Sequence, residues 1–125
     1  MLQKYLVRAA AWLEIITGIA LIIGPQIACR LLFAVPLNGV GMPLGRYAGI
    51  AVLALGTACL PAATAHAGRA VLGLLLYNVG AVILFVWIWL ATTYHGFLLW
   101  PAIILHAGIA FGLLPQLRNR DSVAA

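Results

Sequence analysis

The chain has 125 residues, of which 66% are hydrophobic and only 7% are charged. About a quarter of the residues of a soluble domain are charged, so this composition excludes a water-soluble globular protein and indicates an integral membrane protein. The net charge of +5 comes from basic residues at the ends of the apolar segments, which does not suggest a nucleic-acid partner.

Four apolar runs have about the length needed to cross a bilayer as helices. They cover residues 5–23, 46–61, 70–91 and 97–114. A helix of about 20 residues spans the hydrocarbon core, and Pro and Gly residues stand between the runs. No run shows the alternation with a period of two that is typical of a barrel strand. We therefore predict an all-α fold, in which a single membrane domain of residues 1–125 forms an integral membrane bundle of four transmembrane helices.

The first run contains Glu14, one of only two acidic residues in the chain. A charged side chain at the centre of a bilayer costs about 2.5–3.5 kcal/mol on insertion scales, so such residues are usually functional or paired. Lys4 and Arg8 resemble the basic start of a signal peptide. However, Glu14 interrupts the apolar segment and no clean cleavage site follows it. We expect this run to be retained as a helix.

The segment between the first two runs, residues 25–45, is long for so small a protein. Residues 26–33 suit a short helix at the membrane interface, and residues 36–43 are apolar but rich in helix-breaking residues. The segment either packs over one end of the bundle or is a plain connector, and the sequence leaves both open. We expect Cys29 and Cys59 to stay unpaired, because Cys59 should lie about 20 Å below the start of its helix.

The basic residues predict the orientation of the chain in the membrane. A four-helix topology places Lys4, Arg8, Arg69, Arg118 and Arg120 on one side, and only Arg30 and Arg46 on the other. By the positive-inside rule we expect both termini in the cytoplasm, in a bacterial inner membrane. An aromatic belt at the outer interface would then consist of Tyr47, Trp87, Trp89, Tyr94 and Trp100.

Polar residues from three runs are expected at one depth near the middle of the bilayer. Glu14 and His106 each lie nine residues from the start of their run, and Asn78 lies nine residues from Arg69. Tyr77 adjoins Asn78, and Thr17 shares a helix face with Glu14. We expect a hydrogen-bonded pair of Glu14 and His106, completed by Asn78 or Tyr77. This group either only fixes the helix packing or forms a ligand-binding or proton site. Interhelical hydrogen bonds stabilise by only about 0.6–2 kcal/mol, which favours the second alternative.

The sequence gives no positive signal for an enzyme, since it contains no nucleophile–base set, phosphate-binding loop or pair of catalytic carboxylates. Metal-binding spacings such as HxxxH and CxxC are missing, and neither His66 nor His95 shares the depth of His106. A haem with two histidine ligands inside one chain is therefore unsupported, and a second ligand would have to come from another chain.

Glycines at helical spacing predict close helix contacts, either within the bundle or in a homo-oligomer or larger membrane complex. The pairs are Gly45 and Gly49, Gly108 and Gly112, Gly49 and Gly56, and Gly73 and Gly80.

Residues 12–24, WLEIITGIALIIG, resemble the Glu-x-x-x-Gly-x-x-Leu-x-x-Gly helix of DoxX-like small bacterial membrane proteins, whose size and four-helix plan are similar. In that family the motif tends to lie in the second helix, whereas here it lies in the first. The resemblance implies a non-enzymatic membrane subunit or a protein that binds a small ligand such as a quinone.

Residues 11–16 are also similar in placement to the first helix of small multidrug resistance exporters, which carry an essential Glu at its middle. The Ala-Tyr-Ala-x-Trp-x-Gly pattern of their third helix is missing here, and the long segment 25–45 is foreign to them. We therefore favour the DoxX-like interpretation. Two alternatives stay open: a proton-coupled small-molecule exporter that uses Glu14, and a haem- or quinone-linked redox subunit that uses His106.

Overall fold

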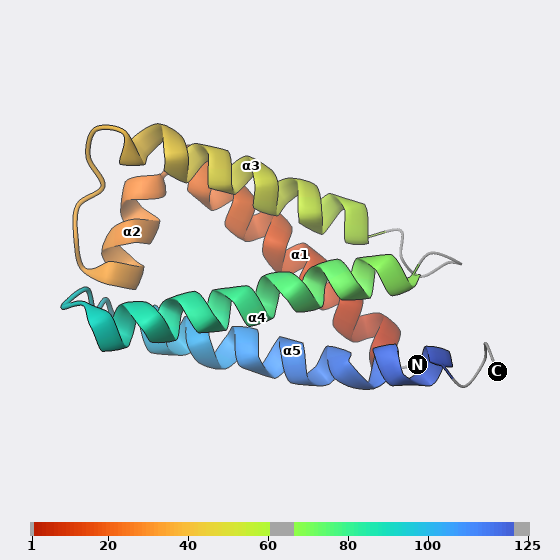
Figure 1. Cartoon of the computed structure of the whole chain (residues 1–125). Helices are drawn as coiled ribbons and strands as arrows, with labels where there is room; N and C mark the ends of the chain where they lie inside the picture. The colour runs from red at the N-terminus through yellow and green to blue at the C-terminus, as the bar shows by residue number, and fades with distance from the viewer. Residues whose placement is uncertain (1, 61–66, 122–125) are drawn as a thin grey trace.

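Five α-helices make up the part of the chain that the computed structural model describes, residues 2–60 and 67–121 (Figure 1). They are α1 (Leu2–Ile23), α2 (Pro25–Phe33), α3 (Gly41–Cys59), α4 (Ala67–Ala91) and α5 (Leu99–Asp121). The described residues contain no strand, which confirms the all-α prediction. Helices α1, α3 and α4 are long and apolar enough to cross a membrane, and they indicate a membrane protein. The fourth predicted span corresponds to α5, whose apolar stretch, Leu99–Pro115, is shorter.

The helix ends differ from the predicted ones mainly where prolines stand. α3 begins at Gly41, five residues before the predicted start, and contains Pro43 in its first turn. A proline is tolerated there because the N–H that it lacks has no partner in a first turn. α5 continues through Pro115 to Asp121 instead of stopping before the proline. The predicted end of the second run, residue 61, lies outside the described residues, and so does His66.

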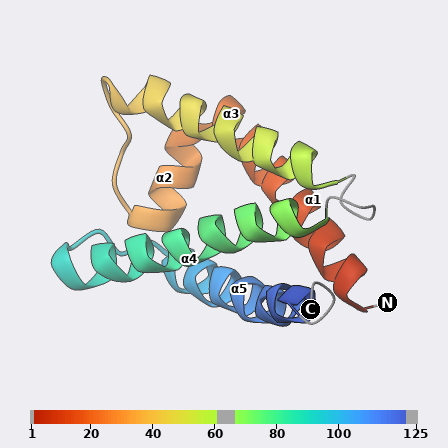
Figure 2. The same ribbon diagram turned by 45° about the vertical axis from the view of Figure 1, so that its right-hand side comes forward.

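The helices form two antiparallel pairs, and α2 lies across one end of the bundle (Figures 1 and 2). α1 packs most extensively against α3, and α4 packs most extensively against α5. In both views the two pairs diverge towards the end where α2 lies. The start of α1, the start of α4 and the end of α5 lie together at the opposite end (Figure 1).

Four of the basic residues lie at the ends of the bundle at which the predicted topology expects them. Arg8 and Arg69 lie near the end that holds the start of α1, whereas Arg30 and Arg46 lie near the end that holds α2. All four side chains are exposed. Which end faces the cytoplasm stays a prediction. The five aromatic residues of the predicted belt are exposed as well, with the rings of Trp89 and Trp100 centred 5.2 Å apart.

Glycines bring the backbones of α1 and α3 into direct contact. A Cβ atom on Gly18 would lie 2.6 Å from the backbone nitrogen of Leu53, and one on Gly49 would lie 2.8 Å from the carbonyl oxygen of Gly18. About two turns further along α3, a Cβ atom on Gly56 would lie 2.7 Å from the carbonyl oxygen of Ala11. No side chain fits in this contact unless the backbones move apart. The prediction that Gly49 and Gly56 mark a close helix contact is therefore confirmed.

The other predicted glycine contacts have mixed outcomes. Gly45, Gly73 and Gly112 each face a side chain of another helix, so they too mark contacts within the bundle. Gly80 and Gly108 do not mark a close contact between helices of the described bundle, because an added Cβ atom on either would meet no atom within 4 Å. The prediction of a contact within the bundle is wrong for these two glycines.

The buried core lies in the half of the bundle that is remote from α2. Its members are small or aliphatic residues of α1, α3, α4 and α5: Val7, Ala10, Ala11, Cys59, Val71, Leu74, Leu75, Ile109, Ala110 and Leu113. Leu74 and Leu113 have no exposed surface. Both cysteines are free, as predicted.

The first part of the segment between α1 and α3 forms the expected short helix, α2. The carbonyl oxygens of Leu31 and Leu32, at its C-terminal end, accept hydrogen bonds of 2.8 and 3.0 Å from the N–H groups of Leu98 and Gly96. These two donors belong to the connection between α4 and α5. α2 is therefore packed across the end of the bundle and is more than a plain connector.

Candidate functional site

Glu14 is buried at the interface between the two helix pairs, with 1% of its surface exposed. In the preceding turn of α1, the small residues Ala10 and Ala11 are also buried and allow the neighbouring helices to approach. The Oε1 atom of Glu14 is buried and has no hydrogen-bond partner among the described residues. A buried polar atom without a partner costs about 1–3 kcal/mol, so this oxygen calls for an explanation.

The hydroxyl of Tyr77, on α4, lies within hydrogen-bonding reach of the Glu14 carboxylate. The phenolic hydroxyl donates and the carboxylate accepts. Tyr77 is half buried, so it lies between the buried carboxylate and the accessible surface. This bond connects α1 to α4, two helices that otherwise contact each other little.

Asn78 fixes the tautomer of His106. Asn78 has no exposed surface, and its Nδ2 donates a hydrogen bond of 2.8 Å to the carbonyl oxygen of Leu74. Its Oδ1 therefore faces Nδ1 of His106, at 2.7 Å. An amide oxygen only accepts, so Nδ1 carries the proton of the neutral imidazole, and the lone pair lies on Nε2. His106 is half buried on α5.

The two hydrogen-bonded pairs meet because Tyr77 and Asn78 are consecutive residues. Neighbouring positions on a helix point about 100° apart, so α4 presents Tyr77 to α1 and Asn78 to α5. The rings of Tyr77 and His106 are in edge-to-face contact, with centroids 5.7 Å apart and an interplanar angle of 74°. A continuous row of contacts thus joins Glu14, Tyr77, His106 and Asn78.

The structure brings four of the five predicted site residues together but pairs them differently. The expected direct hydrogen bond between Glu14 and His106 is wrong, since Glu14 is bonded to Tyr77 and His106 to Asn78. The reason is that equal depth along two helices does not fix the direction in which each side chain points. Thr17 is half buried one turn beyond Glu14, and the described residues show no hydrogen bond of its hydroxyl.

Two aromatic residues that the sequence did not indicate extend this row towards α2. The ring of Phe85 is centred 5.8 Å from that of His106, and the ring of Phe33 is centred 6.1 Å from that of Phe85. Phe85 lies two turns beyond Tyr77 on α4, so helical spacing could have predicted that it shares a helix face with Tyr77. Phe33 lies on α2, and its placement depends on tertiary packing that no spacing rule predicts.

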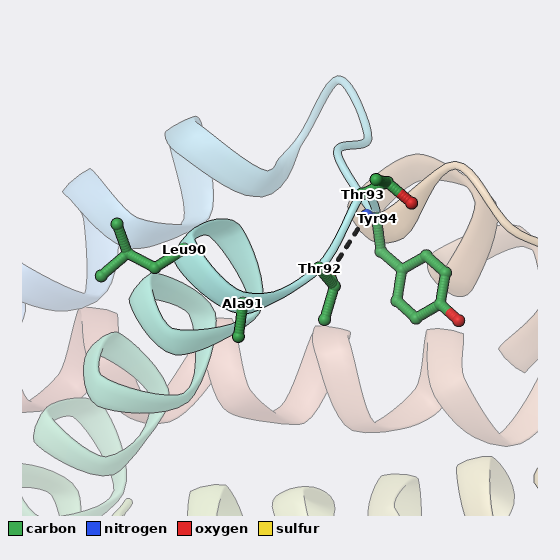
Figure 3. A pocket seen from close by; sticks show the side chains of 5 residues that line it. All are labelled: Leu90, Ala91, Thr92, Thr93 and Tyr94. Atoms are coloured by element: carbon green, nitrogen blue, oxygen red, sulfur yellow. Dashed lines mark hydrogen bonds between the residues drawn. The ribbon is translucent and has the colours of Figure 1, made fainter.

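A shallow surface hollow at the far end of α4 is a separate feature (Figure 3). It is lined by Leu90, Ala91, Thr92, Thr93 and Tyr94. The Oγ1 atom of Thr92 donates to the carbonyl oxygen of Ile88 at 2.8 Å and accepts from the N–H of Tyr94 at 3.1 Å, which ends the helix. The hollow lies about 20 Å along α4 from Tyr77 and contains no carboxylate or imidazole, so it is not part of the Glu14 site.

The remaining described histidine, His95, lies near this hollow and far from His106. Its Nε2 is 3.1 Å from the carbonyl oxygen of Trp89. Within residues 2–60 and 67–121, no three His, Cys, Asp or Glu side chains gather closely enough to hold a metal ion.

No protein family, curated protein or solved structure matches this chain in comparisons with known proteins. The geometry around Glu14 is therefore the basis on which a function is proposed.

Proposed function

We propose that the protein is a small four-span membrane protein, DoxX-like in plan, that binds a lipid-soluble small molecule at the level of Glu14. The observation that carries this proposal is the buried Oε1 atom of Glu14, which lacks a partner among the described residues. A ligand that donates a hydrogen bond to Oε1 would remove the cost of this buried acceptor.

The packing of α5 supports a fourth membrane span. Its apolar stretch, Leu99–Pro115, is about 25 Å long at 1.5 Å per residue, and it packs along α4, which is itself long and apolar enough to cross a bilayer. With four spans, the distribution of basic residues favours a bacterial inner membrane and cytoplasmic termini.

The acceptors of the site indicate which chemistry the ligand offers. Oε1 of Glu14 accepts hydrogen bonds, and so does Nε2 of His106, because its Nδ1 proton is already directed to Asn78. The neighbouring rings of Tyr77 and Phe85 are apolar apart from the tyrosine hydroxyl. A ligand with hydroxyl donors on a flat apolar ring fits these groups, and the head group of a reduced quinone is the simplest example.

The test is the binding of a hydroquinone that carries one ten-carbon alkyl tail to the purified chain in lipid nanodiscs, measured by isothermal titration calorimetry. The dimethyl ether of the same compound lacks both donors and is expected not to compete. Glu14→Gln keeps the size of the side chain but replaces a charge-assisted acceptor with a neutral one, so we expect Kd to rise about tenfold.

Asp121→Asn is the matched control, because it removes the other carboxylate of the chain at the far end of α5. It should leave Kd unchanged. Equal binding of the ether, or an unchanged Kd for Glu14→Gln, would show that Glu14 is not the binding site.

A further inference from the structure

Phe33 of α2 and Phe85 of α4 lie next to the polar groups of the Glu14 site, on the side towards α2. The two rings meet edge to face, with centroids 6.1 Å apart and an interplanar angle of 62°. The ring of Phe85 in turn contacts that of His106, at 5.8 Å and 54°. Phe33, Phe85 and His106 are all half buried, so each keeps part of its surface accessible.

The other side of the site is closed by packed side chains. Leu74, one turn before Asn78 on α4, and Leu113, two turns beyond His106 on α5, have no exposed surface. Both belong to the core in the half of the bundle that is remote from α2. A ligand that approached Glu14 from the end at which α2 lies would meet the half-buried rings of Phe33 and Phe85.

The position of Phe33 is set by the backbone. Phe33 is the last residue of α2, directly after Leu31 and Leu32, whose carbonyl oxygens accept hydrogen bonds from the connection between α4 and α5. A Cβ atom on Gly96 would lie 2.6 Å from the carbonyl oxygen of Leu32, so this connection approaches closely only because residue 96 is a glycine. Ala34, the next residue, has a φ of 58°, which turns the chain away immediately after Phe33.

We propose that Phe33 and Phe85 determine which ligands reach the Glu14 site, by admitting a flat ring and excluding one that carries bulky groups beside its hydroxyls. Aromatic rings favour partners whose centroids lie 4.5–7 Å away, and the two phenylalanines offer such faces next to His106. A tert-butyl group beside a hydroxyl is as thick as it is wide, so it prevents the ligand ring from lying flat against the accessible part of Phe33 or Phe85. The inference rests on the proposed function, because it presumes a ligand that donates hydrogen bonds to Glu14.

The experiment compares two probes on the full chain in lipid nanodiscs. One is the hydroquinone with a ten-carbon tail, and the other is the same compound with a tert-butyl group beside each hydroxyl, so that both carry two hydroxyl groups and differ in the bulk around them. The wild-type protein should bind the flat probe and exclude the bulky one. Phe33→Ala and Phe85→Ala should each improve binding of the bulky probe about tenfold relative to the flat one.

Phe97→Ala is the matched control, since Phe97 also lies at the α2 end but is 85% exposed and contacts neither ring of the pair. It should leave the ratio of the two affinities unchanged. Phe33→Leu and Phe85→Leu, which keep most of the buried volume, provide the same comparison if an alanine variant does not fold, with a smaller shift in the same direction.

The outcomes separate this inference from the proposed function. If the wild-type protein binds both probes equally well, and Glu14→Gln weakens the binding of both, ligands do bind at Glu14 but Phe33 and Phe85 do not discriminate between them. An unchanged affinity ratio in every Phe33 and Phe85 variant overturns the inference in the same way. If the wild-type protein binds neither probe, the proposed function and the inference fail together.

Discussion

The contact between α1 and α3 gives the sharpest test of the fold, through the single substitution Gly49→Ala. The new Cβ atom would lie 2.8 Å from the carbonyl oxygen of Gly18, about 0.6 Å short of the 3.4 Å at which ordinary contact begins. The obstacle is backbone, which no rotamer change can move aside. The two helices must therefore separate along a contact where Gly56 also depends on close approach.

The expected loss follows from this displacement. A radial gap of 0.5–1 Å forfeits about a quarter to a half of the dispersion attraction between the atoms involved, and overpacking substitutions typically cost about 1–3 kcal/mol. We expect Gly49→Ala to lower the free energy of unfolding by about 2 kcal/mol. The measurement is equilibrium unfolding in mixed micelles with increasing sodium dodecyl sulfate, followed by far-UV circular dichroism.

Gly108→Ala is the matched control, because it makes the same chemical change in α5, at a position where an added Cβ meets no atom within 4 Å. Alanine favours the helical conformation over glycine, so this variant should be as stable as the wild type or slightly more stable. If Gly49→Ala is no less stable than Gly108→Ala, the close backbone contact between α1 and α3 is not present in the protein.

Three further predictions concern the site and the orientation of the chain. Asn78→Leu removes the acceptor for Nδ1 of His106 and should lower the free energy of unfolding by about 1–3 kcal/mol in the same unfolding assay, while a leucine at exposed Val79 should change it little. Tyr77→Phe removes the hydroxyl bonded to Glu14 and should also destabilise the protein, by about 1.5–3 kcal/mol, and an unchanged stability would argue against that bond. In a variant without Cys29 and Cys59, a membrane-impermeant thiol reagent added outside intact cells should modify Arg30→Cys but not Arg8→Cys, and the reverse pattern would invert the predicted topology.

The helices were predictable because a bilayer leaves the backbone few alternatives. Apolar runs of sufficient length must bond their own N–H and C=O groups, so their positions followed from composition alone. The errors came from treating Pro43 and Pro115 as helix boundaries. Pro43 falls in a first turn, where it removes no hydrogen bond, and Pro115 is carried inside α5. The sequence offers no local signal that separates these positions from the prolines that do end helices.

The level of the site residues along their helices was predictable, but the direction in which each side chain points was not. Counting residues from the ends of the runs brought Glu14, Asn78 and His106 to one level, which the structure agrees with through the row of contacts that joins them. Which partner each side chain takes depends on the rotation of each helix about its axis. That rotation is set by packing between helices, and above all by the glycine contact that fixes α1 against α3. The same dependence on packing kept Phe33 out of the predicted site.

The two halves of the polar row differ in a way that bears on its purpose. On the α4–α5 side the amide nitrogen and the amide oxygen of Asn78 each make a hydrogen bond, so His106 is held in one tautomer by a fixed partner. On the α1 side Glu14 keeps one buried oxygen without a partner among the described residues. A methionine or leucine at position 14 would pack against the same neighbours without that cost, so stability alone favours an apolar residue there. Nε2 of His106 is thus an acceptor held in a fixed orientation, and Oε1 of Glu14 is an acceptor without a donor among the described residues. This combination is expected where a bound molecule brings the missing donor.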